Sequence, residues 1–186
     1  AFEDFFDEQR PFFIEGGEIF KSGDYDLLYS RRIGRQPGYF ALPDDAEERD
    51  RPESTTILGA VKLTGKTKGK TAFGLLQAVT APEYADIRRD VGGQAKNSEY
   101  RVEPLTSYLV GRVRQDVLDG TSGVGLFLSS VNRRGGSSAY VGAADWDLKF
   151  RADKYNLTGL FAASRAGEEG DRSSGYIAHV EFDKKG

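Results

Sequence analysis

The sequence predicts an all-β protein: an antiparallel up-and-down β-barrel of the outer-membrane type, with about eight strands present as part of a larger barrel. Three observations predict this fold. Long segments alternate between apolar and polar residues, and the connections between them alternate between short and long. No apolar run approaches the roughly 18 residues of a membrane-spanning helix. The mean hydropathy of −0.52 fits such a barrel, because half of each strand is polar.

The stretch Ala139–Arg151 has the clearest strand pattern. One parity is apolar and aromatic, and it supplies the lipid-facing candidates Tyr140, Trp146, Leu148 and Phe150. The other parity becomes fully charged in its second half, at Asp145, Asp147, Lys149 and Arg151. Successive side chains of a strand point to opposite faces, so this pattern predicts one apolar and one charged face. A soluble β-sandwich can show the same alternation. The length, however, is roughly 11–13 residues, enough to cross a bilayer when the strand is tilted.

Seven further segments are strand candidates: Asp26–Ile33, Ile57–Gly65, Thr71–Thr80, Ser107–Val117, Val124–Asn132, Tyr155–Ser164 and Gly175–Asp183. Most of them also have one apolar face. The first 25 residues differ, because aromatic side chains crowd an acidic segment that Pro and Gly interrupt. The sequence therefore predicts an irregular N-terminal segment at residues 1–25 and a barrel segment at residues 26–186.

The connections alternate in length. Short ones are expected at Lys66–Lys70, Leu118–Gly123 and Ala152–Lys154, and long ones at Gly34–Thr56 and Ala81–Thr106. Bacterial outer-membrane barrels have short turns at one end and longer loops at the other. We therefore expect the short turns to share one end of the sheet and the long connections the other.

Composition excludes several classes of function. The net charge of −3 gives no electrostatic footprint for nucleic acid. The chain has no Cys, which excludes disulfides and thiolate metal sites, and His179 is its single histidine. We expect no catalytic, cofactor-binding or metal-binding residues, and no cofactor. The chain begins at Ala1 without a signal-peptide pattern, so we expect it to be processed, trimmed or a fragment.

Charged residues of the polar parities are the lumen-lining candidates: Lys62, Arg112, Arg114, Asp145, Asp147, Lys149 and Arg151. Asp145 and Asp147 lie about 7 Å apart along one strand face. Paired acids of this kind could serve glycoside hydrolysis, which leaves enzymatic activity open. Lys149 and Arg151 on the same parity favour a ladder of neutralising ion pairs instead.

Five motifs occur in order along nearly the whole chain. They are Glu8–Phe20, Leu28–Arg35, Ile57–Lys66, Glu103–Arg112 and Val141–Phe150. Together they resemble the predicted outer-membrane β-barrel domain, a domain of unknown function, of the bacterial carbohydrate-binding family 9 domain-containing proteins. The resemblance implies the N-terminal part of a large barrel. In family members a small sandwich resembling a sugar-binding module precedes that barrel, and we expect the present chain to lack this module.

The expected location is the bacterial outer membrane, and the expected role is solute passage or docking at the cell surface. Outer-membrane lipid is the expected partner, together with further barrel strands or another chain. Carbohydrate would be contacted through the absent upstream module. The alternative is a soluble β-barrel or sandwich that binds a carbohydrate or another small ligand.

Overall fold

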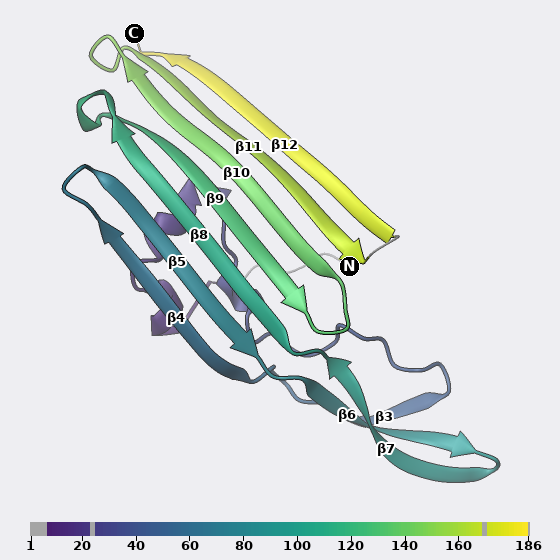
Figure 1. The fold of residues 1–186 in the computed structure, drawn as a ribbon. Helices are drawn as coiled ribbons and strands as arrows, with labels where there is room; N and C mark the ends of the chain where they lie inside the picture. Colours follow the sequence, from purple (N-terminus) through teal and green to yellow (C-terminus); the bar gives the residue numbers. More distant parts are fainter. Residues whose placement is uncertain (1–6, 23–24, 169–170, 186) are drawn as a thin grey trace.

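The computed structural model describes residues 7–22, 25–168 and 171–185. It shows an antiparallel all-β protein whose main element is a seven-stranded sheet in the order β12-β11-β10-β9-β8-β5-β4 (Figure 1). Its strands are β4 (Ile57–Lys66), β5 (Thr71–Thr80), β8 (Thr106–Val117), β9 (Ser122–Arg133), β10 (Ser138–Phe150), β11 (Tyr155–Glu168) and β12 (Asp171–Lys184). A three-stranded sheet of β3 (Ala46–Asp50), β6 (Glu83–Val91) and β7 (Gln94–Glu103) extends beyond one end.

The seven-stranded sheet is a meander. Every pair of neighbours is antiparallel, and β5 pairs directly with β8 although the β6–β7 hairpin separates them in sequence. The three short turns, after β4, β8 and β10, lie at one end of the sheet as expected from the connection lengths (Figure 1). Non-glycine residues take positive φ in these turns, at Lys70, Leu118 and Arg151–Asp153. The predicted up-and-down order is therefore confirmed within this sheet.

Two predictions about strands are wrong. The candidate Asp26–Ile33 is not a strand of the main sheet: Asp26 ends the two-residue β2 (Tyr25–Asp26), and Ser30–Arg32 forms a 3-10 turn, η2. The connection Ala81–Thr106 contains the hairpin β6–β7 instead of a loop. Pro82 and Pro104 flank this hairpin, and proline removes a ladder donor, so the hairpin strands separate from β5 and β8.

The N-terminal segment packs on one face of the main sheet, which we call the covered face (Figure 1). Its elements are the one-turn helix α1 (Pro11–Ile14), the 3-10 turn η1 (Gly17–Phe20) and the short pair β1 (Lys21–Ser22) and β2. Phe13, Phe20 and Ile33 enter a core with residues that the sheet supplies: Leu76, Ala78, Tyr108, Val110, Phe127, Ala143 and Leu160. Residues 1–6 and 23–24 of the predicted irregular segment lie outside the described residues.

The opposite, open face of the sheet has no other element packed on it within the described residues. The sheet is also open at its edges: β4 and β12 each have one neighbour, and no closed barrel forms in the described chain. The fold that the structure establishes is thus an open seven-stranded antiparallel meander, covered on one face.

Candidate functional site

An ion pair lies at the centre of the covered face. Arg112 of β8 donates to both carboxylate oxygens of Asp145 on β10, over 2.7 and 2.8 Å. Both side chains are essentially inaccessible to solvent, with exposed fractions of 0% and 2%. Arg114 approaches the same carboxylate at 3.5 Å. A bidentate guanidinium–carboxylate contact is geometrically specific, so the pair fixes β8 relative to β10.

Two glycines of the intervening strand make room for this pair. Gly125 of β9 is directly opposite Asp145 in the ladder, and a Cβ there would lie 2.5 Å from Asp145 Oδ1. At Gly123 a Cβ would lie 2.6 Å from Arg114 Nη2. Because both glycines face the covered side, charged side chains from the neighbouring strands meet across β9.

The remaining lumen-lining candidates have different environments. Lys62 faces the N-terminal segment, and its Nζ donates to the carbonyl oxygens of Phe12 and Glu15. Asp147 and Lys149 share the covered face and approach each other only to 4.0 Å. Arg151 lies in the turn after β10, not on a strand face. The expected ion pairing thus occurs, but with Arg112 and Arg114 as the partners of Asp145 in place of Lys149 and Arg151.

A second ion pair holds the N-terminal segment together. Arg10 donates to both carboxylate oxygens of Glu8 at 2.8 and 2.7 Å, and to the carbonyl of Ile33 at 2.6 Å. Ser30 Oγ donates to Glu8 Oε2 at 2.6 Å. The hydrogen bond from Arg10, opposed by partial burial, lowers the pKa of Glu8 from 4.5 to about 2. Residues 8–10 are thereby joined to residues 30–33, across the whole segment.

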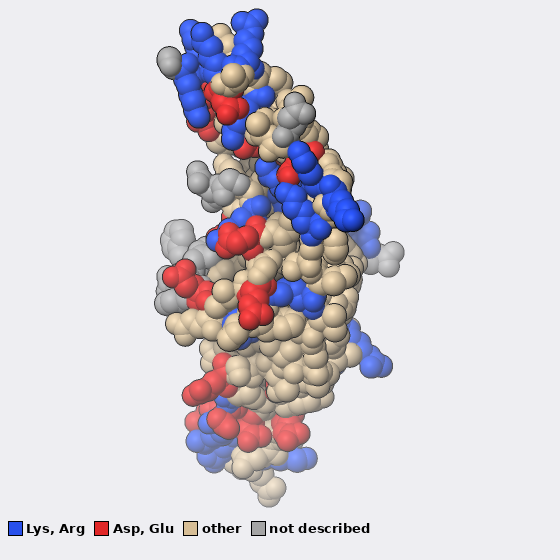
Figure 2. Space-filling model, turned by 90° about the vertical axis from the view of Figure 1, so that its left-hand side faces the viewer, with Lys and Arg blue, Asp and Glu red and all other residues tan. Residues whose placement is uncertain are grey.

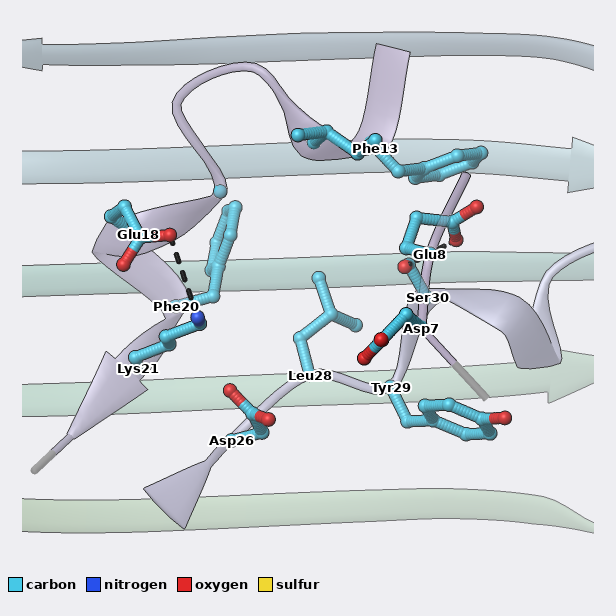
Figure 3. A pocket seen from close by; sticks show the side chains of 12 residues that line it. Asp7, Glu8, Phe13, Glu18, Phe20, Lys21, Asp26, Leu28, Tyr29 and Ser30 are labelled. Carbon is cyan, nitrogen blue, oxygen red and sulfur yellow. Dashed lines mark hydrogen bonds and ion pairs between the residues drawn. The ribbon is translucent and has the colours of Figure 1, made fainter. Parts of the chain in front are cut away.

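This segment encloses a pocket of about 340 Å³. Figure 3 shows Glu8 and Ser30 together on one side of it, Phe20 and Leu28 near its centre, and the Glu18–Lys21 ion pair on the other side. Every lining residue belongs to residues 7–30. The pocket is therefore an internal feature of the segment and not a channel through the sheet.

A polar cavity of about 310 Å³ separates β1–β2 from the end strands of the sheet. Asp147, Asn156, Glu181 and other residues of β10–β12 line it. The Tyr25 hydroxyl closes one side through a 2.9 Å hydrogen bond with His179 Nδ1. Among the described residues, no group of three or more His, Cys, Asp or Glu could hold a metal ion.

The open face is apolar across all seven strands. Its exposed apolar side chains are Val61, Leu63, Leu75, Leu109, Val113, Val124, Leu126, Leu128, Tyr140, Phe150, Phe161, Tyr176, Val180 and Phe182. Trp146 and Leu148 share this face and are half-buried. The predicted separation of Trp146, Leu148 and Phe150 from Asp145, Asp147 and Lys149 is confirmed by the register. Monomeric soluble proteins rarely expose so large a contiguous apolar surface.

Two aromatic rings on the open face lie over glycines of adjacent strands. A Cβ at Gly159 would be 2.2 Å from the indole of Trp146, and one at Gly65 would be 2.9 Å from the ring of Phe73. An aromatic ring that covers a cross-strand glycine is a known means of fixing register. These contacts therefore stabilise β10–β11 and β4–β5.

Polar pairs border the open face at both ends. Gln77 donates to Ser107 at 2.9 Å, and Tyr140 donates to Asn132 at 2.8 Å, at the end next to the three-stranded sheet. At the turn end, Thr71 donates to Gln115 at 2.6 Å. Figure 2 shows Lys and Arg gathered at the turn end, mixed charges over the three-stranded sheet and a broad uncharged area between them. The apolar surface is thus a band with polar borders.

A family model described as a domain of unknown function, DUF5916, matches residues 1–186. The chain belongs to the DUF5916 family. No curated protein and no solved structure matched it. The family description carries neither a barrel nor a carbohydrate-binding name, so the expected resemblance is established only as membership of a family of unknown function.

Within this DUF5916 chain, the sequence pattern missed two contacts between residues that are far apart in the sequence. Tyr25 and His179 are 154 positions apart and carry no shared motif. Glu103 is buried and accepts hydrogen bonds from the backbone of Gly38 and Tyr39, both at 3.0 Å. An acid directly before Pro104, at the end of a strand, was the one available signal for this contact.

Among the described residues, no helix is long and apolar enough to cross a membrane.

Proposed function

We propose that the seven-stranded sheet is part of the wall of a bacterial outer-membrane β-barrel. The open face would lie against lipid, and the covered face with its N-terminal segment would face the barrel interior. One observation carries this proposal: apolar side chains cover the open face of every strand. Apart from Arg165, Arg172 and Lys184 at the borders of that face, the charged side chains of the sheet lie on the opposite face, as does the packed segment. In a soluble β-sandwich, the apolar face of a sheet packs against a second sheet and is buried. The present sheet would then have to bury its open face as well as its covered face.

The dimensions of the apolar band support the same proposal. On β10 the band runs from Phe150 to Tyr140, ten residue steps. At about 3.3 Å per residue this is about 33 Å along the strand. A tilt of about 40° reduces the height to about 25 Å, that of the apolar band in outer-membrane barrels. Tyr140 and Tyr176 near one border, and Phe150 and Tyr155 near the other, occupy the positions of interfacial aromatic girdles.

The open edges agree with a larger barrel. Strands β4 and β12 present unpaired backbone groups, and a membrane interior tolerates none. Further strands of the same barrel, or those of another chain, would complete the ladder. In that arrangement the covered-face charges border the interior, which favours solute passage over surface docking as the role. The N-terminal segment would partly fill that interior, in the manner of a plug.

A matched pair of substitutions on β12 tests the lipid assignment. Val180 on the open face and Glu181 on the covered face are adjacent in the sequence. Val180 is 64% exposed as a residue, and the side chain of Glu181 is 58% exposed. In a membrane, Val180→Arg should reduce the stability of the vesicle-inserted protein by about 2–4 kcal/mol, and Glu181→Arg far less. In water, both exposed sites should tolerate arginine within about 0.5 kcal/mol. Equal tolerance of the two variants in vesicles would contradict the proposal.

The polar cavity between β1–β2 and the end strands favours a second candidate function. Its volume suits a single sugar residue, and hydroxyl, amide and carboxylate groups line it. A soluble carbohydrate-binding domain would use this cavity and remain soluble without detergent. Solubility of the chain in detergent-free buffer, combined with sugar binding lost on Asn156→Ala, would favour this alternative.

A further inference from the structure

A groove crosses the middle of the open face. It has a volume of about 670 Å³, and apolar atoms form most of its surface. Leu75, Leu109 and Leu128 form its walls. Gly111 of β8 and Gly142 of β10 form its floor, one on each side of Leu128 in the same row of the ladder. Because both glycines lack a side chain, the band is hollowed at these two positions, between the projecting leucine side chains.

The groove leads to two arginines at the border of the band. Arg165 of β11 lines the groove and also lines a smaller pocket of about 390 Å³ together with Arg172 of β12. Tyr140 lines both and is directly opposite Arg165 in the ladder. Ser138, Gly167 and Arg172 form the next row. Both arginines therefore lie on the open-face parity, Arg165 in the last aromatic row and Arg172 in the row beyond it.

The two guanidinium groups have no ion pair with any described side chain. At this depth of a bilayer, the groups available to them are lipid phosphates. Arginine binds phosphate through two parallel N–H groups, and tyrosine is typical of the same interfacial level. Two arginines without an ion partner among the described side chains, next to an apolar groove, are complementary to a molecule that is anionic at one end and apolar along its length.

We propose that this groove is a binding site for one anionic phospholipid. An acyl chain lies between Leu75, Leu109 and Leu128, and the headgroup phosphate is bound by Arg165 and Arg172. The inference rests on the proposed lipid exposure of the open face and adds a specific site to it. A soluble phosphate compound would need the arginines but not the groove, so the groove decides in favour of a lipid.

The test titrates the whole chain in nonionic detergent with phosphatidylglycerol or phosphatidylcholine and counts bound lipid by native mass spectrometry. The double variant Arg165→Gln/Arg172→Gln should weaken phosphatidylglycerol binding roughly 25-fold, since each interfacial arginine contributes about a factor of five. At Gly142 the nearest atom to an added Cβ is Leu128 Cδ2 at 3.6 Å, an ordinary van der Waals distance, so a larger side chain fits there without a clash. Gly142→Val should therefore fill the groove and weaken the binding of the acyl chain. The control Arg88→Gln/Lys96→Gln removes two exposed cations from the three-stranded sheet and should change binding little.

The possible outcomes distinguish the phospholipid site from the more general assignment of the open face to lipid. One phosphatidylglycerol per chain, lost in the arginine pair and in Gly142→Val but not in the control, supports the site. Unchanged binding in the arginine pair, while Val180→Arg still destabilises the vesicle-inserted protein, overturns the site and leaves the lipid-facing assignment intact. Glycerol phosphate bound with the same dependence on the arginines, and without any effect of Gly142→Val, indicates a soluble ligand and overturns the lipid proposal.

Discussion

Arg112 and Asp145 form a two-bond ion pair across an intervening strand, although 33 positions separate them in the sequence. Gly125 is the residue that they cross, and Arg114 supports the same carboxylate. The pair lies under the N-terminal segment, where solvent does not reach it. Its location makes it a structural element of the covered face and argues against Asp145 as an accessible acid for hydrolysis.

Removal of the carboxylate charge should be costly. In Asp145→Asn the buried Arg112 loses its counter-charge, which in other proteins costs about 3–5 kcal/mol. Asp147→Asn is the matched control, because Asp147 is 35% exposed and lies 4.0 Å from Lys149, so its loss should cost less than about 1 kcal/mol. Urea unfolding of the detergent-solubilised chain measures both values. Similar unfolding midpoints for the two variants would contradict the assigned role of the pair.

A methyl group at position 125 should disturb the same pair without removing either charge. In Gly125→Ala the new Cβ would lie 2.5 Å from Asp145 Oδ1 and 3.0 Å from Arg112 Nη2, so the side chains must shift. We expect a loss of about 1–3 kcal/mol, the usual cost of overpacking. Gly111→Ala is the control, since nothing lies within 4 Å of a Cβ there. An equal effect of the two alanines would show that strand propensity, and not the ion pair, sets the cost.

The Glu8–Arg10 pair predicts a pH-dependent attachment of the N-terminal segment. The pKa of Glu8 is about 2 in the folded protein and 4.5 in the reference state, so the stabilisation is complete above pH 4.5. It is lost as the pH falls towards 2, because both states then bind the proton. Proteolysis of the segment should therefore be faster in Glu8→Gln than in the parent chain at neutral pH, and the difference should vanish near pH 2. Pepsin, active at low pH, and a neutral protease together cover this range, and a difference that persists at pH 2 would contradict the assignment.

The alternation of β10 was sufficient to predict which residues share a face, because parity follows from the backbone alone. The ion partner of Asp145 could not be predicted in this way. Lys149 and Arg151 are nearer in sequence, but same-face neighbours on one strand diverge, while Arg112 is long enough to cross a glycine on β9. Gly123 and Gly125 on the covered parity were the only local signals of that contact.

The β6–β7 hairpin has a local signal in the sequence, the pair Gly92-Gly93. Gly92 and Gly93 both take positive φ, at 66° and 80°, as a two-residue hairpin turn requires. Asp90 accepts a hydrogen bond from the Gly93 backbone at 2.7 Å. The charged residues on both flanking strands concealed the alternation, since Ala85 and Ile87 are the buried residues among the described side chains of β6. The open edges at β4 and β12 could not be predicted in this way, because the pairing of an edge strand depends on other strands and not on its own local sequence.

The single tryptophan gives the most direct test of the membrane assignment. Trp146 lies on the open face near the middle of the apolar band, in the ladder row of Gly159 and Val180. In vesicles, lipids brominated deep in the acyl chain should quench its fluorescence strongly, and aqueous iodide should quench it weakly. Efficient quenching by iodide, with no effect of the brominated lipids, would show that the open face lies in water and would contradict the account.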